Sequence, residues 1–129
     1  MNIKIVNLTP HAVNFYRQDN VCWNSSLGWV LKDGVSPYLN IEPSKIIARC
    51  KKIVKQTGSI DGIPLQASEY GDIEGLPNAA NGVVYLASQA VCTAAAKKGR
   101  IDVYYPDELV RNEKGAIVGC MALGREKPL

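Results

Sequence analysis

Apolar and polar positions alternate over short stretches of the chain, and glycine, proline, asparagine or aspartate residues separate these stretches. Alternation combined with β-branched and aromatic residues is typical of β-strands. We therefore predict strands at residues 2–8, 12–16, 46–55, 63–70, 83–87, 101–105, 109–111 and 116–121. The alternation fails at Lys52 and Ile53, which indicates a β-bulge there. Thr57–Gly58 and Asp61–Gly62 predict turns.

One stretch has the features of a helix. Residues 89–98 contain four alanines and end in two lysines, which suit the last turn of a helix. Ser88 stands where an N-cap belongs, and Gly99 stands where a left-handed C-terminal residue belongs. The sequence thus predicts a buried strand that runs directly into a short helix.

The predicted elements define a fold class. Many short strands with one clear short helix indicate an α+β protein with a mainly antiparallel sheet. Residues 112–115 have the composition of a hairpin turn between the last two strands. A length of 129 residues is sufficient for one hydrophobic core, so we expect a single domain over residues 1–129.

Charge is distributed unevenly along the chain. Residues 43–60 contain five basic residues and no acidic ones, whereas residues 61–96 contain four acidic residues and no basic ones. This polarity fits two solvated strand faces, a self-complementary assembly, or a positive surface for an anion. The net charge of +3 is too small to argue for binding of a DNA or RNA duplex.

Several classes of protein are excluded by composition. The four cysteines form no C-x-x-C motif, and His11 is the single histidine, so neither a metal site nor a cofactor is expected. Residues 75–96 lack charge, but Pro77, Asn78, Asn81, Gly82 and Gln89 make them a poor membrane span. The N-terminus has no signal-peptide pattern, so we expect a cytoplasmic setting with reduced thiols.

Catalytic signatures are weak. The sequence has no G-x-S-x-G elbow, no Walker A loop and no G-x-G-x-x-G motif. His11 could act as a base, and Asp102, Asp107 and Glu108 could act as acids or bases, but nothing in the sequence pairs them. We expect a protein that is not an enzyme.

A binding site for an anion is the stronger hypothesis. Free amides at Ser88 and Gln89 open the predicted helix and suit a phosphate. Arginine presents a planar fork that matches phosphate, and three arginines lie in or beside predicted elements: Arg49, Arg100 and Arg111. The alternative is that the helix simply packs on a sheet and the arginines are solvated.

Other side chains could complete such a site. Asp102 could accept hydrogen bonds from ribose hydroxyls or form a salt bridge with Arg100, and Tyr70 could stack on a base. Nanomolar capture requires about 12 kcal/mol, which corresponds to roughly four to six charge-assisted or stacking contacts. One small subunit would have difficulty providing them, so we expect a homo-oligomer. Trp23 and Trp29 could cap a small core, fill a subunit contact or form a stacking platform.

Short motifs across the chain resemble those of a group of small phage and prophage proteins. They are residues 7–11, 43–44, 48–49, 75–77, 85–88, 100–102, 110–111 and 115–120. The group is similar to the Thoeris anti-defence sponge family of the first type. That resemblance implies a non-enzymatic oligomer in the host cell that sequesters cyclic ADP-ribose-type signals made by bacterial TIR proteins.

The resemblance has further implications. It implies a second site for cyclic oligonucleotides, and it places ligand contacts at Arg49, Tyr70, Arg100 and Arg111. Two other functions stay open from the sequence. One is a small phage-encoded hydrolase that uses His11 or a carboxylate, and the other is a module that binds a host protein.

Overall fold

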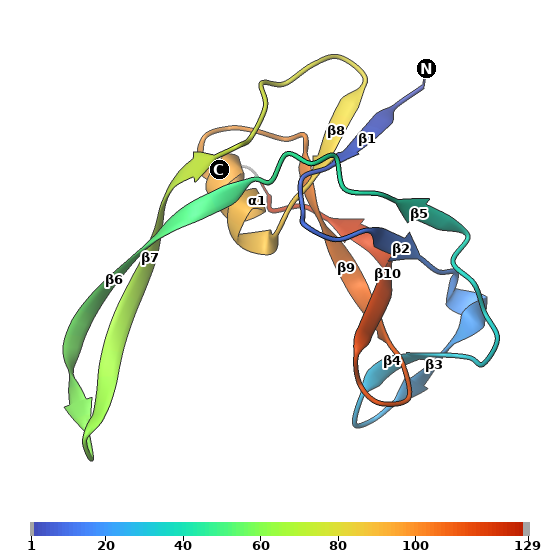
Figure 1. Ribbon diagram of the computed structural model, residues 1–129, viewed down its shortest axis with the longest axis horizontal. Helices are drawn as coiled ribbons and strands as arrows, with labels where there is room; N and C mark the ends of the chain where they lie inside the picture. Colours follow the sequence, from blue (N-terminus) through green and yellow to red (C-terminus); the bar gives the residue numbers. More distant parts are fainter. Residues whose placement is uncertain (1, 128–129) are drawn as a thin grey trace.

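The computed structural model describes residues 2–127, which form ten strands, one α-helix and one short 3₁₀ helix. Figure 1 shows their arrangement. In chain order the elements are β1 (Lys4–Asn7), β2 (Val13–Phe15), η1 (Gln18–Asn20), β3 (Val21–Asn24), β4 (Gly28–Leu31), β5 (Leu39–Ile41), β6 (Arg49–Ile60), β7 (Ile63–Glu74), β8 (Val83–Leu86), α1 (Gln89–Lys97), β9 (Val103–Arg111) and β10 (Ile117–Gly124).

The main sheet is mixed, which corrects the prediction of a mainly antiparallel sheet. Its strands follow the order β1-β8-β9-β10-β2-β5, and β4 pairs with β9 and β3. The pairs β1–β8, β8–β9, β10–β2 and β4–β9 are parallel. The parallel pairing of β8 and β9 follows from helix α1, which connects these two strands as a crossover.

Strand β9 is longer than the sequence suggested. We predicted two strands interrupted at Pro106, but β9 runs without a break from Val103 to Arg111. Its pairing with β8 ends at Tyr104 and its pairing with β4 begins at Trp29 opposite Val110. Pro106 therefore lies where β9 pairs only with β10. Proline has no N–H group to donate, and at this position no second strand requires one.

Helix α1 covers one face of the sheet. Its buried residues Val91, Cys92, Ala95 and Ala96 face a hydrophobic core that also includes Leu8 and Val103 from the strands. The helix begins after Ser88, as predicted, and Gly99 adopts a positive φ of 83° just past its end. No helix within residues 2–127 is long and apolar enough to cross a bilayer.

Strands β6 and β7 form a separate two-stranded sheet, which we call the arm (residues 49–74). The arm projects away from the body, and no other element lies along its outer part (Figure 1). We predicted a turn at Thr57–Gly58, but β6 continues through these residues with a register irregularity between Gln56 and Gly58. The chain reverses at Asp61 and Gly62, whose φ angles of 50° and 79° are those of a type I′ hairpin turn.

Candidate functional site

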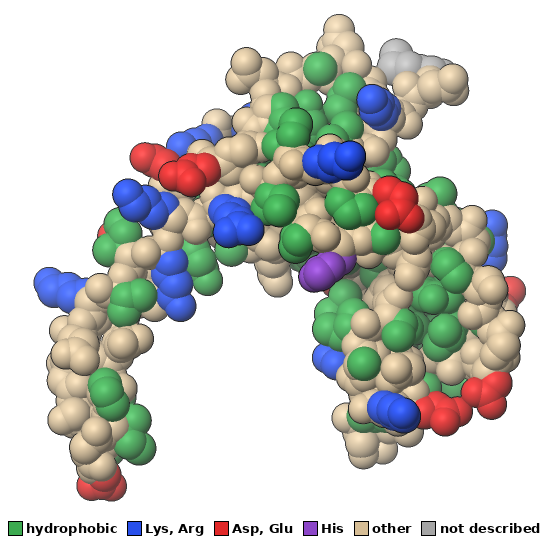
Figure 2. Space-filling model, viewed as in Figure 1, with side chains coloured by type: hydrophobic (Ala, Val, Ile, Leu, Met, Phe, Trp, Pro, Cys, Tyr) green, Lys and Arg blue, Asp and Glu red, His purple; other side chains and the backbone are tan. Residues whose placement is uncertain are grey.

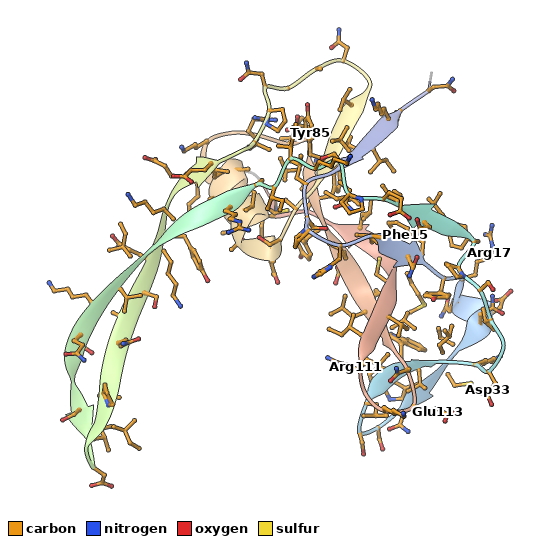
Figure 3. The ribbon with its side chains drawn as sticks, viewed as in Figure 1. Phe15, Arg17, Asp33, Tyr85, Arg111 and Glu113 are labelled. Atoms are coloured by element: carbon orange, nitrogen blue, oxygen red, sulfur yellow. The ribbon has the colours of Figure 1, made fainter. Side chains whose placement is uncertain are left out.

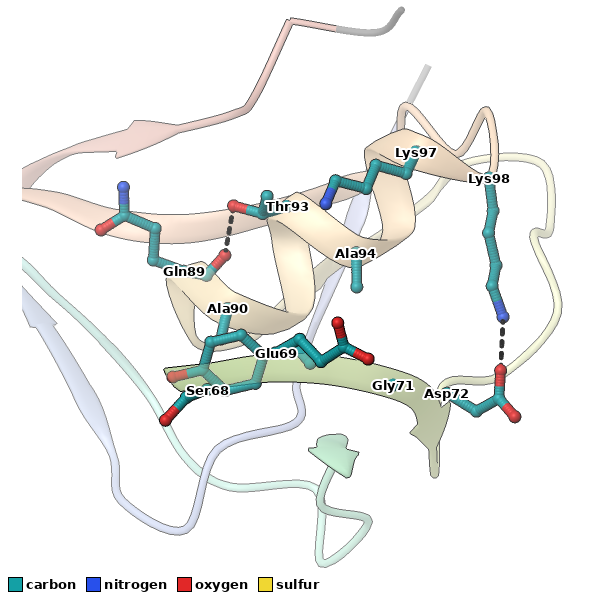
Figure 4. Close-up of a pocket in the computed structure, with 11 residues that line it drawn as sticks. Ser68, Glu69, Gly71, Asp72, Gln89, Ala90, Thr93, Ala94, Lys97 and Lys98 are labelled. Carbon is teal, nitrogen blue, oxygen red and sulfur yellow. Dashed lines mark hydrogen bonds and ion pairs between the residues drawn. The ribbon is translucent and has the colours of Figure 1, made fainter. Parts of the chain in front are cut away.

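A groove of about 910 Å³ lies between helix α1 and strand β7 (Figure 4). We call it the helix–arm groove. Ala90 and Ala94 line the groove on the α1 side, and their short side chains leave space beside β7. The lining residues are Ser68, Glu69, Tyr70, Gly71, Asp72, Gln89, Ala90, Thr93, Ala94, Lys97 and Lys98.

Charged groups of both signs line this groove. Lys97 ends α1 and Lys98 is its C-cap residue, and Glu69 and Asp72 come from β7. Lys98 Nζ lies 3.6 Å from Asp72 Oδ1, and both side chains are largely exposed. Such a solvated ion pair is weak. The lysine is therefore available to an anion that competes with the carboxylate.

Two of the predicted ligand residues, Tyr70 and Gln89, meet in the groove. Tyr70 is 56% exposed, which leaves its ring accessible for stacking. Gln89 is also exposed and offers an amide that can donate and accept. The neighbouring Thr93 hydroxyl is engaged, because it donates to the carbonyl oxygen of Gln89 at 3.0 Å. The groove thus combines an aromatic face, an amide and two ammonium groups.

Ser88 acts as a structural cap. Its Oγ accepts a hydrogen bond from the amide of Val91 at 3.3 Å, so the protein's own side chain occupies one of the amides that open α1. This limits the anion site that we hypothesised at the helix start. Any anion there would have to use the remaining amides of the first turn together with side chains of the groove.

Arg100 and Asp102 bind each other. Arg100 Nε donates to Asp102 Oδ1 at 2.8 Å, and Nη2 donates to Oδ2 at 2.9 Å and to the carbonyl oxygen of Pro77 at 3.0 Å. Hydrogen bonding to Arg100 holds the pKa of Asp102 below its usual value, although partial burial opposes this. Of the two roles considered for Asp102, the structure shows the salt bridge. Neither residue lines the helix–arm groove.

Arg111 and Arg49 lie in two further places. Arg111 Nη1 donates to the carbonyl oxygen of Gly115 at 2.8 Å and so supports the β9–β10 turn, far along β9 from α1 (Figure 3). Arg49 is exposed at the base of the arm, opposite Glu74 in the register. The structure therefore does not gather the three predicted arginines into one site.

The cationic groups of the groove were missed in the sequence. We assigned Lys97 and Lys98 to the helix dipole, and we treated Glu69 and Asp72 as a solvated strand face. One signal in the sequence could have found them. The uncharged residues 75–96 have acidic residues directly before them and Lys97 and Lys98 directly after them. Only the tertiary packing of β7 beside α1 shows that they share a groove.

Other candidates have structural roles. His11 is exposed in the turn after β1, and its backbone carbonyl accepts from the side chains of Asn7 and Thr9. Trp23 and Trp29 form an edge-to-face pair, and Trp29 Nε1 donates to Glu108 at 3.0 Å. Within residues 2–127, no three histidine, cysteine or acidic side chains are grouped so that they could hold a metal ion.

Comparisons of the chain with protein-family models, with curated proteins and with solved structures found no match.

Proposed function

We propose that the protein binds a small phosphate-bearing nucleotide signal of the cyclic ADP-ribose type in the helix–arm groove and sequesters it without cleavage. The observation that carries the proposal is the meeting of the Tyr70 ring with Lys97 and Lys98 in one groove of about 910 Å³. That volume lies within the range of small-molecule sites. The resemblance of the sequence motifs to the Thoeris sponge family supports the choice of ligand class.

Each part of such a ligand has a counterpart in the groove. An adenine ring would stack on Tyr70, a contact that contributes about 1–3 kcal/mol. The two lysines would neutralise the diphosphate, with roughly 1.5–3 kcal/mol for each charge-assisted hydrogen bond. Ribose hydroxyls would donate to Glu69, which also lines the groove. These contacts reach the strength needed for tight capture only if most of them form together.

We propose binding rather than turnover because, among the described residues, no hydrogen bond joins a hydroxyl of the groove to one of its carboxylates, and the Thr93 hydroxyl donates to a backbone carbonyl. Its carboxylates stand across from lysines, and His11 lies in the turn after β1, outside the groove lining. We also propose a homo-oligomer in the cytoplasm of the host cell. A second subunit would close the exposed side of the groove and add the contacts that one subunit lacks.

One other function has an observation in its favour. The arm exposes several large apolar side chains, among them Ile60 and Ile63 at its tip, and such surfaces are typical of protein contacts. A module that binds a host protein through the arm would use this surface and leave the groove empty. Ligand binding distinguishes the two functions.

Isothermal titration calorimetry with cyclic ADP-ribose tests the proposal. We expect saturable binding that weakens at least about tenfold in Tyr70→Ala, the loss expected for one stacking contact. Tyr38→Ala is a matched control, because Tyr38 is 51% exposed but lies outside the groove. Recovery of intact ligand after denaturation is expected for a sponge. Absence of heat with cyclic ADP-ribose and its linkage isomers, or recovery of a cleaved product, would contradict the proposal.

A further inference from the structure

The arm lacks the support that a hairpin of its length requires. Strands β6 and β7 have 12 residues each and pair only with one another among the described residues. Only the base of the arm reaches the hydrophobic core, through Cys50 and Ile73. An isolated pair of strands is marginally stable in water, and it gains stability when a third element covers one face. The outer arm therefore requires a partner that the single chain does not supply.

Directly opposed residues share a face and successive residues alternate, so the strand register assigns the paired arm residues to one of two faces. The register is irregular between Cys50 and Lys52 and between Gln56 and Gly58, and the unpaired residues there are left unassigned. One face continues from Cys50 and Ile73 and carries Tyr70, Val54 and Ser68 toward the helix–arm groove. The opposite face carries an apolar series that we call the arm stripe: Ile53, Ile60, Ile63, Leu65 and Ala67.

The arm stripe is exposed along its whole length. Its four large side chains are between 38% exposed, at Leu65, and 64% exposed, at Ile63. Apolar and basic side chains are visible along the arm in Figure 2. Single exposed apolar residues are ordinary, but an apolar series on one face of an uncovered strand pair marks a contact surface.

We infer that the arm stripe docks against the arm stripe of a second copy of this chain. The inference names the contact of the homo-oligomer that the proposed function includes. The two faces of such a contact are the same surface, which is what a two-fold symmetric interface requires.

Charge favours a second copy over other partners. Strand β6 carries Arg49, Lys51, Lys52 and Lys55 and no acidic residue, whereas β7 carries Glu69, Asp72 and Glu74 and no basic one. A two-fold axis along the arm stacks the two hairpins so that β6 of one copy lies over β7 of the other. Lys55 lies on the stripe face itself, so the lysine of each copy approaches the acidic strand of the partner.

The area of the arm sets a limit on this contact. At about 3.3 Å per residue the arm is roughly 40 Å long, and with a width of about 10 Å one face covers on the order of 400 Å². A stable interface requires about 800 Å² from each partner. The arms alone supply about half of that area. The same two-fold axis brings both bodies to the same end of the paired arms, where they supply the remainder.

Sedimentation velocity of the purified full-length protein tests the inference. We expect the mass of a dimer or of a larger assembly of dimers, where one chain has a mass of 14.0 kDa. Ile53→Lys replaces an apolar side chain of the contact with a charged one that loses its water on docking, so we expect it to weaken association at least about tenfold. Val54→Lys is the matched control, because Val54 is next in β6 and 46% exposed, against 49% for Ile53, but lies on the opposite face. We expect this control to retain the wild-type mass.

Two outcomes would overturn the inference. One is a purified wild-type protein that stays monomeric at tens of micromolar, which would leave the stripe to a different partner. The other is an oligomer that Ile53→Lys leaves intact. Circular dichroism of both lysine variants checks that they fold. Calorimetry with cyclic ADP-ribose on the same samples separates the ligand from the contact. An oligomer without ligand binding contradicts the ligand and leaves the arm contact standing. Ligand binding by a monomer contradicts the arm contact and the homo-oligomer and leaves the ligand standing.

Discussion

Arg100 holds Asp102 through two parallel hydrogen bonds, of 2.8 Å from Nε and 2.9 Å from Nη2. The same guanidinium donates to the carbonyl oxygen of Pro77, so it ties the loop before β8 to the segment between α1 and β9. The side chains of the pair are 23% and 16% exposed, which screens them from water better than the pair Lys98–Asp72. The arginine that we expected to bind a phosphate is instead a structural clamp.

Asp102→Asn is expected to destabilise the protein by about 1–3 kcal/mol at pH 7, since it removes a charge-assisted pair. The pKa of Asp102 is lowered in the folded state, chiefly by the hydrogen bond from Arg100. The contribution of the pair is therefore complete above the unfolded-state pKa of about 3.9 and is lost as the pH falls through the lower folded-state pKa. Urea unfolding of both proteins should show a difference that shrinks below about pH 4. A difference that stays constant down to pH 2 would show that the carboxylate charge is not its source.

Gly75→Ala is expected to cost more than Gly99→Ala. Both glycines have positive φ, 84° and 83°, so alanine strains the backbone equally at each. At Gly99 an added Cβ meets nothing within 4 Å, whereas at Gly75 it collides with the carbonyl oxygen of Ile47. The amide of Ala48 is bonded to the carbonyl oxygen of Leu8, so that backbone has little freedom to move.

We expect a loss of about 1 kcal/mol for Gly99→Ala and roughly 2–4 kcal/mol for Gly75→Ala. Chemical denaturation of the two variants gives the comparison. Equal losses would mean that the segment at Ile47 yields, and that the base of the arm is less rigid than its contacts indicate.

Alkylation should distinguish the exposed cysteine from the two buried ones. Cys22 is exposed, whereas Cys92 and Cys120 are buried. Burial raises the pKa of Cys92 to about 12 and the pKa of Cys120 to about 11, so almost no thiolate forms at pH 8. Iodoacetamide at pH 8 should modify Cys22 first and leave Cys92 and Cys120 unmodified until denaturant is added, as read by peptide mass mapping. Labelling of Cys92 at the rate of Cys22 would show that α1 opens readily.

Local chemistry could be predicted from the sequence where it acts within a few residues. The two ends of α1, at Ser88 and Gly99, were predicted because a cap hydroxyl and a left-handed glycine act only on neighbouring residues. Asp61–Gly62 gave the arm turn for the same reason. The parallel pairing of β8 and β9 was not predicted, because it depends on where the crossover helix packs.

The candidate site was less predictable, because it depends on distant partners. Asn7 interrupts an apolar run in the sequence, but in the structure it is 1% exposed and bonds Thr9 and the carbonyl oxygens of His11 and Ile41. Arg111 likewise supports a turn four residues away. Which polar side chains are used internally, and which remain available to a ligand, follows only from packing. Tyr70 and Gln89 are the two predicted residues that packing leaves accessible in the groove.

Asp72→Asn is expected to strengthen the binding of an anionic ligand and to leave stability almost unchanged. Asp72 and Lys98 are 93% and 59% exposed, and a pair this solvated contributes about 0–1 kcal/mol at most. Loss of the carboxylate frees Lys98 and removes a repulsive charge from the groove wall. Two charges about 6 Å apart in water interact by roughly 0.7 kcal/mol, so the affinity for cyclic ADP-ribose should rise about threefold at low salt.

Asp33→Asn is the matched control for Asp72→Asn, because it changes the net charge equally but lies outside the groove lining. Titration calorimetry at low and high salt should show the gain for Asp72→Asn alone, and screening should reduce it as the ionic strength rises. An equal gain in both variants would mean that the ligand responds to net charge only. A weaker affinity in Asp72→Asn would mean that this carboxylate contacts the ligand and accepts a hydrogen bond from a ribose hydroxyl. It would contradict the proposal that Asp72 repels the ligand.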